Sequence, residues 1–310
     1  MRGGGYGWNS RFYGPACLSL RAVDVVLADG ELVHADDASH PDLLWAARGA
    51  GPGFFGVVTR FYLQVYPRPR VTWIGQVYPL ELHDEVVSWS LELLPRLPAN
   101  VEMSLRVGYS PALAVPTVSV TALAFAERDA GSDDDALLRE VESNPLLARA
   151  LAREKVQPDL LPDLNNRGGE GARVLRWDVD GVWTDATTAE ILPAAAAAGL
   201  GAVPSGDCFV LWMLWGHHPT RENACWSTQA PLYLSPNAGW SDAADDARHR
   251  QWVDGALSSL ADLSRGVQFS DADLATRHGA GLTPENAKRV EEIRAIYDPE
   301  RRFFPYMSPA

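Results

Sequence analysis

Residues 3–14 read Gly-Gly-Gly-Tyr-Gly-Trp-Asn-Ser-Arg-Phe-Tyr-Gly, and the interpretation of the whole chain starts from this stretch. Glycine loses the most conformational freedom on folding, so a dense cluster indicates that another group approaches the backbone closely. Flat rings and phosphates are such groups, because bare N–H groups can face them with no Cβ in the way. The dinucleotide fingerprint GxGxxG does not fit, because its third glycine would fall on Trp8 and no strand precedes the cluster. A disordered tail is the alternative, but tails are rarely as aromatic as this stretch.

Four further stretches follow in a fixed order. Residues 20–33 read LRAVDVVLADGELV, residues 41–51 read PDLLWAARGAG, and residues 55–59 read FGVVT. Near the end, residues 286–304 contain Arg289-Val290, Tyr297-Asp298-Pro299 and Arg302-Phe303. In this order and spacing the chain resembles the flavin-dependent oxidoreductases with a PCMH-type FAD-binding domain, the berberine bridge enzyme-like family. The resemblance covers both ends of the chain well and the middle loosely.

The expected architecture is α+β. Predicted strands and helices separate along the chain rather than alternate strictly, and 310 residues suggest about two domains at roughly 150 residues each. The resemblance implies an FAD-binding domain built from both ends, with an antiparallel-sheet-and-helix substrate domain inserted between them. We therefore expect a partial FAD-binding domain at 1–66, a substrate domain at 67–278, and a C-terminal return to the FAD-binding domain at 279–310.

Apolar periodicity and turn residues predict the individual elements. Strands are predicted at 20–27, 31–35, 56–66, 71–78, 102–109, 116–126, 173–183, 208–216 and 225–234. Helices are predicted at 36–49, 83–97, 136–153, 184–199, 242–263 and 283–297. The dipeptide Asp29-Gly30 predicts a tight turn, and Thr283 followed by Pro284 predicts the start of the last helix.

The family's N-terminal part is longer and includes a loop of the form RSGGH. That loop wraps the FAD pyrophosphate and often bears the histidine that is bonded to the flavin. The present chain begins just after this point in the family pattern. Three explanations remain open: the chain is a truncated fragment, its partner half is a separate polypeptide, or it no longer holds FAD. Truncation is the simplest of them.

The resemblance also implies the cofactor-binding residues, with FAD as the cofactor. Gly3, Gly4, Gly5 and Gly7 would lie against the flavin and its linker, with Tyr6 as their neighbour. Gly56, Val57 and Val58 would offer backbone groups to the adenosine part. For the glycines at 49–53, a simple turn and a flavin contact are equally good interpretations.

The catalytic residues follow from the resemblance only by an alignment that needs a gap. Family members carry acid–base residues on substrate-domain strands that face the flavin. Here Gln229 stands where the family often has arginine, and Tyr233 stands near its usual acidic position. A tyrosine can act as a base if a nearby positive charge lowers its pKa, but a half-buried strand aromatic is the commoner role. Tyr306 is a further aromatic candidate, and His217 and His218 are weaker ones in an expected turn.

Composition narrows the partners. The formal net charge of −13 disfavours nucleic acid and anionic membranes, which bind basic surfaces. No apolar run reaches the ~18 residues of a membrane span, and no signal-like leader opens the chain, so we expect a cytoplasmic protein. The three cysteines lack CxxC spacing, which favours buried thiols over a disulfide framework or a metal site.

Two functions therefore remain. The first is an FAD-dependent oxidoreductase, oxidase-like, or a truncated fragment of one, which oxidises a hydroxyl or amine of a small specialised metabolite by two electrons. The second is a non-catalytic small-molecule-binding protein derived from the same scaffold. The apolar aromatic runs at 209–215 and 225–234 would line an apolar pocket in either case.

Overall fold

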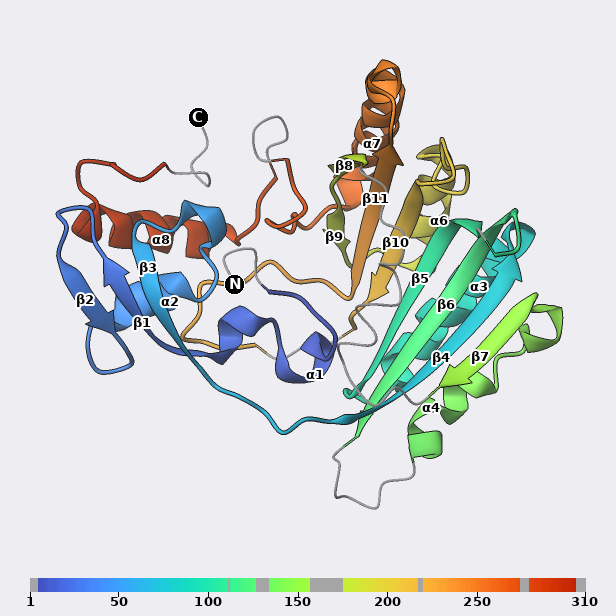
Figure 1. The fold of residues 1–310 in the computed structure, drawn as a ribbon, viewed down its shortest axis with the longest axis horizontal. Coiled ribbons are helices and arrows are strands. Elements are labelled where there is room, and N and C mark those ends of the chain that lie inside the picture. The colour runs from blue at the N-terminus through green and yellow to red at the C-terminus, as the bar shows by residue number, and fades with distance from the viewer. Residues whose placement is uncertain are drawn as a thin grey trace. The chain divides into compact units, whose positions relative to one another are not determined.

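The structure is a computed structural model that describes residues 5–110, 112–126, 134–156, 175–216, 220–273 and 279–304. The chain divides into two compact units (Figure 1). Unit 1 comprises Met1–Tyr66, His218–Gln229 and Arg265–Ala310, and unit 2 comprises Pro67–His217 and Ala230–Ser264. The domain bounds predicted from the sequence, 1–66, 67–278 and 279–310, remain a prediction; the two units divide the chain after Tyr66, and unit 1 also includes the segments 218–229 and 265–278.

Unit 1 packs three helices with one small sheet. Its strands are β1 (Leu20–Val26), β2 (Leu32–Ala35) and β3 (Val57–Leu63), in the antiparallel order β2-β1-β3, and its helices are α1 (Ser10–Tyr13), α2 (Pro41–Ala47) and α8 (Pro284–Tyr297). One core of buried apolar residues joins β1, β2, α2 and α8, so both ends of the chain share a single hydrophobic core.

Local sequence explains two of these features. At the β1–β2 turn Gly30 has φ of 91°, and the carboxylate of Asp29 accepts a hydrogen bond from the N–H of Glu31 at 2.9 Å. At the start of α8 the hydroxyl of Thr283 accepts from the N–H of Asn286 at 3.5 Å, and Pro284 occupies the first turn. Both arrangements match the predicted turn and cap.

Unit 2 is an eight-stranded antiparallel sheet with helices. Its strands are β4 (Arg70–Pro79), β5 (Val101–Ser110), β6 (Val115–Ala126), β7 (Ala152–Val156), β8 (Arg176–Val179), β9 (Val182–Thr184), β10 (Phe209–Leu214) and β11 (Leu232–Trp240). The order is β7-β4-β6-β5-β10-β11-β8, and β9 pairs with β11 beside β8. Its helices are α3 (His83–Leu93), α4 (Asp134–Glu142), α6 (Thr188–Ala197) and α7 (Asp246–Leu260), and together with unit 1 they confirm the α+β class.

The two faces of this sheet differ. Apolar side chains on one face pack with α3, α4, α6 and α7 in one large core, to which the sheet contributes Ile74, Tyr78, Leu105, Val107, Val120, Val210, Trp212 and Leu234, among others. Because strand side chains alternate, the neighbouring residues on each strand point to the opposite face. We call this opposite side of the sheet the open face, because it contributes none of its side chains to that helix-covered core.

Three predicted elements were wrong in part. The predicted helix at 136–153 ends at Glu142, because Pro145 disfavours helical geometry at the preceding Asn144, and residues 152–156 instead form β7. The predicted strand at 173–183 is two strands, β8 and β9, separated by Asp180 and Gly181. The predicted strand at 225–234 begins only at Leu232.

The reason for the last error lies in long-range hydrogen bonds. The N–H groups of Cys225 and Trp226 donate to the carbonyls of Trp45 and Arg48 at the end of α2, at 3.1 and 3.0 Å. The carbonyl of Cys225 accepts from the side chain of Asn286 at 2.9 Å. These backbone groups are therefore engaged by two helix ends and are not available to a sheet.

Candidate functional site

In unit 1, the glycine-rich stretch, the end of α2 and the segment 218–229 meet around Trp226. A Cβ on Gly49, whose φ is 134°, would fall on the Trp226 backbone. The Tyr6 and Trp226 rings lie 5.8 Å apart between centroids, and both pack with Cys17 and Leu18. Burial raises the pKa of the Tyr6 phenol well above its usual value. Gly49 therefore has a structural role. The sequence left open whether the glycines at 49–53 form a turn or contact the flavin, and for Gly49 the packing against Trp226 explains the glycine.

The predicted flavin-contacting glycines have different surroundings. Gly3 and Gly4 lie outside the described residues. Gly5 has φ of 73°, and a Cβ there would stand 2.8 Å from the Cβ of Ala16, so its bare backbone is explained by packing within the chain. Gly7 is exposed, and nothing lies within 4 Å of the place its Cβ would take. Gly7 therefore leaves room for a flat group beside its Cα, although its N–H donates to Oγ of Ser10 at 2.9 Å and its carbonyl accepts from the same hydroxyl at 2.7 Å.

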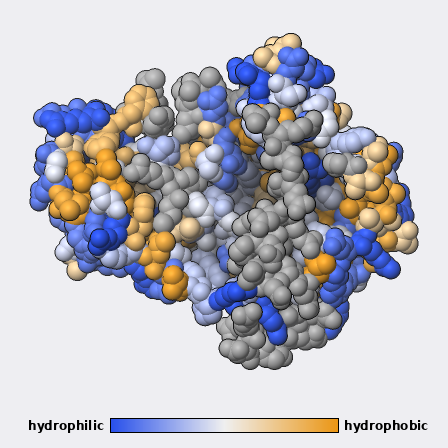
Figure 2. Space-filling view, viewed as in Figure 1, coloured by the Kyte–Doolittle hydropathy of each residue, from blue (hydrophilic) through white to orange (hydrophobic). Residues whose placement is uncertain are grey.

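The predicted adenosine contacts lie at the start of β3. A Cβ on Gly56 would meet Val25, so this glycine also serves packing. Val57 is 50% exposed, and Val58 packs partly against the unit 1 core. β3 ends the order β2-β1-β3, which leaves one of its backbone edges without a strand partner among the described residues. Figure 2 shows apolar residues gathered over the part of unit 1 that it displays.

Some buried polar atoms of unit 1 lack a hydrogen-bond partner within the described part of the chain. Nη2 of Arg48 and Oγ1 of Thr228 are among them. Arg48 is only 1% exposed; its Nε donates to the carbonyl of Leu20 at 2.9 Å, and its Nη1 donates to the carbonyl of Asn223 at 3.0 Å and to the carboxylate of Asp37 at 3.2 Å. Burial, together with the charge of Arg221, lowers the pKa of Arg48. A ligand with an acceptor group would satisfy such atoms, so the residues present fit an anionic cofactor such as FAD.

In unit 2, the open face carries a group of polar and aromatic side chains. Strand register places Ser104 beside Thr121 on one side and beside Met213 on the other, with Tyr233 beyond Met213. Two residues along, Arg106 lies between Ser119 and Leu211. The hydroxyl of Ser119 donates to the Arg106 carbonyl, whereas the hydroxyls of Ser104 and Thr121 have no partner in the described part of the protein.

Arg106 is a cation on this face. It is half-buried, and its guanidinium lies over the ring of Phe209 at 4.5 Å from the centroid. Burial lowers the pKa of Arg106, and no charged neighbour in the described part of the chain offsets that effect. The prediction from sequence missed this residue; the only signal was an arginine that follows Glu102 and Ser104 at the alternate, polar positions of the strand.

Tyr233 lies in an aromatic group on the same face. Its ring is 4.9 Å from that of Trp183, and Trp183 is 6.3 Å from Trp215. A Cβ on Gly181 would stand 2.6 Å from the Tyr233 hydroxyl oxygen, so this glycine makes room for the phenol. Tyr233 is 2% exposed.

The other predicted catalytic residues are not brought to this face by the described structure. Gln229 is half-buried at the end of the segment 218–229 and belongs to unit 1. Tyr306, His217 and His218 lie outside the described residues.

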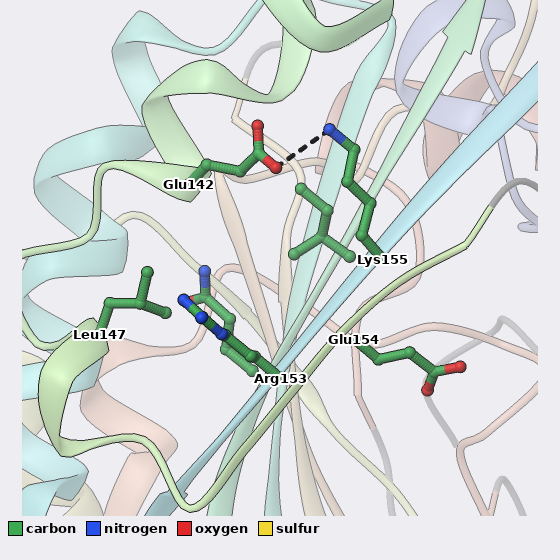
Figure 3. Close-up of a pocket in the computed structure, with 7 residues that line it drawn as sticks. Glu142, Leu147, Arg153, Glu154 and Lys155 are labelled. Atoms are coloured by element: carbon green, nitrogen blue, oxygen red, sulfur yellow. Dashed lines mark hydrogen bonds and ion pairs between the residues drawn. The ribbon is translucent and has the colours of Figure 1, made fainter.

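A separate cavity of about 360 Å³ lies at the edge of unit 2, between the end of α4 and the strands β4 and β7 (Figure 3). Glu142 and Lys155 form an ion pair of 3.0 Å across it, and Arg153 reaches toward Leu147. The cavity includes Ile74 and Gln76, so it lies on the helix-covered side of the sheet. Because its charged walls are exposed to solvent, it lacks the apolar enclosure typical of a substrate site.

Comparisons with known proteins give a consistent family. The FAD-linked oxidoreductase janO of Penicillium janthinellum is 28% identical over 314 residues, which cover 96% of this chain and 67% of that protein. The chain spans about two thirds of the length of the curated relatives it matches over most of its length. No protein-family model matches it.

Solved structures share the fold. The 6-hydroxy-D-nicotine oxidase of Arthrobacter nicotinovorans superposes with a TM-score of 0.78 at 22% identity, over 99% of this chain and 70% of that one. The berberine bridge enzyme-like protein 1 of Physcomitrella patens superposes with a TM-score of 0.76 at 15% identity, over 98% and 68%. The comparisons lend no support to a separate polypeptide that completes the FAD-binding domain. Among the described residues, no helix has the length and apolar character needed to cross a membrane.

Proposed function

Because this chain belongs to the berberine bridge enzyme-like family of FAD-linked oxidoreductases, we propose that it is an oxidase-like enzyme for a hydroxyl or amine of a small specialised metabolite. The observation that carries the proposal is the similarity to an FAD-linked oxidoreductase over 96% of the chain, which includes both units. FAD, when bound, supplies the acceptor for two electrons, and the protein binds, orients and protects the reactants.

Unit 1 would hold the cofactor. Nothing lies within 4 Å of the Cβ position of Gly7, beside Tyr6, and Nη2 of Arg48 and the hydroxyl of Thr228 are buried donors without a partner among the described residues. A guanidinium pairs well with phosphate, and a hydroxyl with any acceptor oxygen. The remaining residues proposed for FAD contact are Gly3, Gly4, Gly5, Gly56, Val57 and Val58.

Unit 2 would bind the substrate on its open face. Leu211, Met213 and Phe209 supply apolar contact, and Ser104 and Thr121 supply hydroxyls. An apolar surface with a few polar groups is typical of a small-molecule site. We propose that Tyr233 handles the proton that leaves the substrate; Gln229 and Tyr306 remain further candidates.

The first experiment tests cofactor binding. The purified chain is mixed with FAD, freed of unbound cofactor by gel filtration, and its visible spectrum is recorded. We expect flavin bands to elute with the protein. A Gly7→Leu variant should retain less flavin, whereas the matched Gly201→Leu variant, at an equally open glycine in unit 2, should retain as much as the unmodified protein.

The outcomes separate the two candidate functions. Retained flavin that is bleached anaerobically by a hydroxyl- or amine-bearing compound supports the oxidoreductase. A folded protein that retains no flavin but binds small aromatic compounds overturns it in favour of a binding protein. That second function is favoured by one observation: at Gly5 and Gly56 the space beside the glycine is filled by the chain itself.

A further inference from the structure

Arg106 is a cation without a counter-charge. Among the described residues it forms no ion pair and no side-chain hydrogen bond, and its one specific contact is with the Phe209 ring. The nearest acidic side chain on the same face of β5 is Glu102, four residues away, which corresponds to roughly 13 Å along a strand. Acidic residues outnumber lysine and arginine in this chain, 40 to 27. A half-buried arginine that pairs with no carboxylate among the described residues is therefore unexpected.

A structural role explains this arrangement only in part. A cation over an aromatic ring gains about 0.5–2 kcal/mol, and the arginine stem can cover apolar surface. Neither role uses the five N–H donors, which lose water when the group is partly buried. An apolar residue of similar length would cover Phe209 without that desolvation cost. The guanidinium is therefore better explained by a group that binds to it.

The neighbours of Arg106 limit what that group can be. Leu211 lies directly across the β5–β10 pair, and Phe209 lies diagonally, within reach of a side chain as long as arginine. Ser104 is two residues along on the same face, with its unpartnered hydroxyl beside that of Thr121. The geometry offers a fork of donors at one end, hydroxyls near it, and apolar side chains around both.

From this geometry we propose that Arg106 binds a carboxylate on the substrate, so that the preferred substrates are small apolar or aromatic acids. A carboxylate matches the guanidinium fork with two parallel hydrogen bonds, and a neutral amide cannot reproduce the charge. The ring or chain of the acid would lie along Leu211, Met213 and Phe209. This inference rests on the proposed function, because only an enzyme has a substrate. The binding of a carboxylate to Arg106 can nevertheless be measured without turnover.

The test compares benzoate with benzamide, which has the same shape without the charge. Binding to the 310-residue chain, with and without added FAD, is measured by isothermal titration calorimetry. We expect benzoate to bind at least about tenfold more tightly, since a charged hydrogen bond is worth roughly 1.5–3 kcal/mol. The Arg106→Met variant should lose this preference, and Arg106→Lys should keep a part of it.

The matched control is Arg153→Met. Arg153 is also an arginine without a partner among the described residues, but it is exposed and on the opposite side of the sheet. This variant should bind benzoate like the unmodified protein. Circular dichroism verifies that each variant is folded, and if Arg106→Met is not, the lysine variant decides.

Equal binding of benzoate and benzamide, or an unchanged preference in Arg106→Met, overturns the inference. Failure of the proposed function has a different signature. Flavin retention without a carboxylate preference leaves the oxidoreductase standing and removes the role of Arg106. A carboxylate preference without flavin retention supports Arg106 as a ligand-binding residue and removes the oxidation.

Discussion

The backbone of Trp226 occupies the place that a Cβ on Gly49 would take. Gly49 follows α2, and Trp226 is far along the chain, yet the N–H of Trp226 donates to the carbonyl of Arg48 at 3.0 Å. This close approach needs a residue without a side chain and with a φ of 134°, which residues other than glycine rarely adopt. The glycine at this position therefore joins a distant segment to the N-terminal lobe.

We expect Gly49→Ala to destabilise the protein by about 2 kcal/mol or more, because backbone strain and the clash with Trp226 add. Urea unfolding followed by circular dichroism measures this. Gly255→Ala is the matched control: this glycine is exposed in the interior of α7, with nothing within 4 Å of its Cβ position. That change should stabilise by about 0.5–1 kcal/mol, and equal effects of the two changes would contradict the interpretation.

Arg294 of α8 stabilises the loop after α2. It is 1% exposed, its Nη2 donates to the carbonyl of Gly53 at 2.5 Å, and its Nε pairs with Glu291 at 3.1 Å. We expect Arg294→Met to cost about 3 kcal/mol of the free energy of unfolding, since the removed cation leaves buried acceptors unpaired. Arg301 pairs with the same glutamate at 2.7 Å but is 54% exposed, so Arg301→Met should cost less than about 1 kcal/mol.

The sequence predicted elements whose signals are local. The Asp29-Gly30 turn and the Thr283 cap depend on residues within a few positions, and both were correct. The segment at 225–231 was mistaken for a strand because its backbone partners, Trp45, Arg48 and Asn286, are far away in sequence. An apolar run that is held by helix ends has the same local pattern as one held in a sheet.

The sequence predicted the residues of the candidate site less well than it predicted the fold. The position of Gly7 was singled out by its neighbours, but whether a glycine faces open space or another part of the chain depends on the fold, as Gly5 and Gly7 illustrate. Arg106 was not singled out at all. Its contact with Phe209 arises from the register between β5 and β10, and its lack of a counter-charge depends on every strand around it.

Because of Tyr78, the free energy of unfolding should fall as the pH becomes alkaline. It is fully buried, its hydroxyl donates to Oε1 of Gln76 at 2.7 Å and accepts from Nδ2 of Asn144 at 2.8 Å, and burial raises its pKa to about 12. Because the folded pKa lies above the ordinary value near 10, this contribution to stability is complete below pH ~10 and is lost as the pH rises toward 12.

The Tyr78→Phe variant isolates this effect. At neutral pH it should be less stable by about 1–3 kcal/mol, since Gln76 and Asn144 lose their buried partner. The difference from the unmodified protein should shrink between pH 10 and 12, as measured by urea unfolding at each pH. Tyr62→Phe, at an exposed tyrosine, should show no such shrinking difference. A constant difference for Tyr78→Phe would exclude the proposed linkage.

The thiols should be unreactive in the native state. Cys17, Cys208 and Cys225 are free and buried, as the sequence predicted. Burial raises the pKa of Cys17 to about 12 and also raises that of Cys225, so little thiolate is present near neutral pH. We expect a thiol reagent to modify none of the three within minutes at pH 8, and all three after denaturation; rapid modification of the native protein would contradict the burial.

Replacement of Tyr233 tests its proposed role as the proton-handling group. The phenol lies on the open face against Gly181, beside Trp183. We expect Tyr233→Phe to lower the rate of anaerobic flavin reduction by about 100-fold or more, since general-base catalysis contributes 10²–10⁴, while KM changes little. Tyr78→Phe, on the opposite face of the sheet, serves as the control and should leave this rate unchanged despite its lower stability. A merely structural tyrosine at 233 would change the free energy of unfolding but not the pH dependence of the reduction rate, and that result would remove Tyr233 from the mechanism.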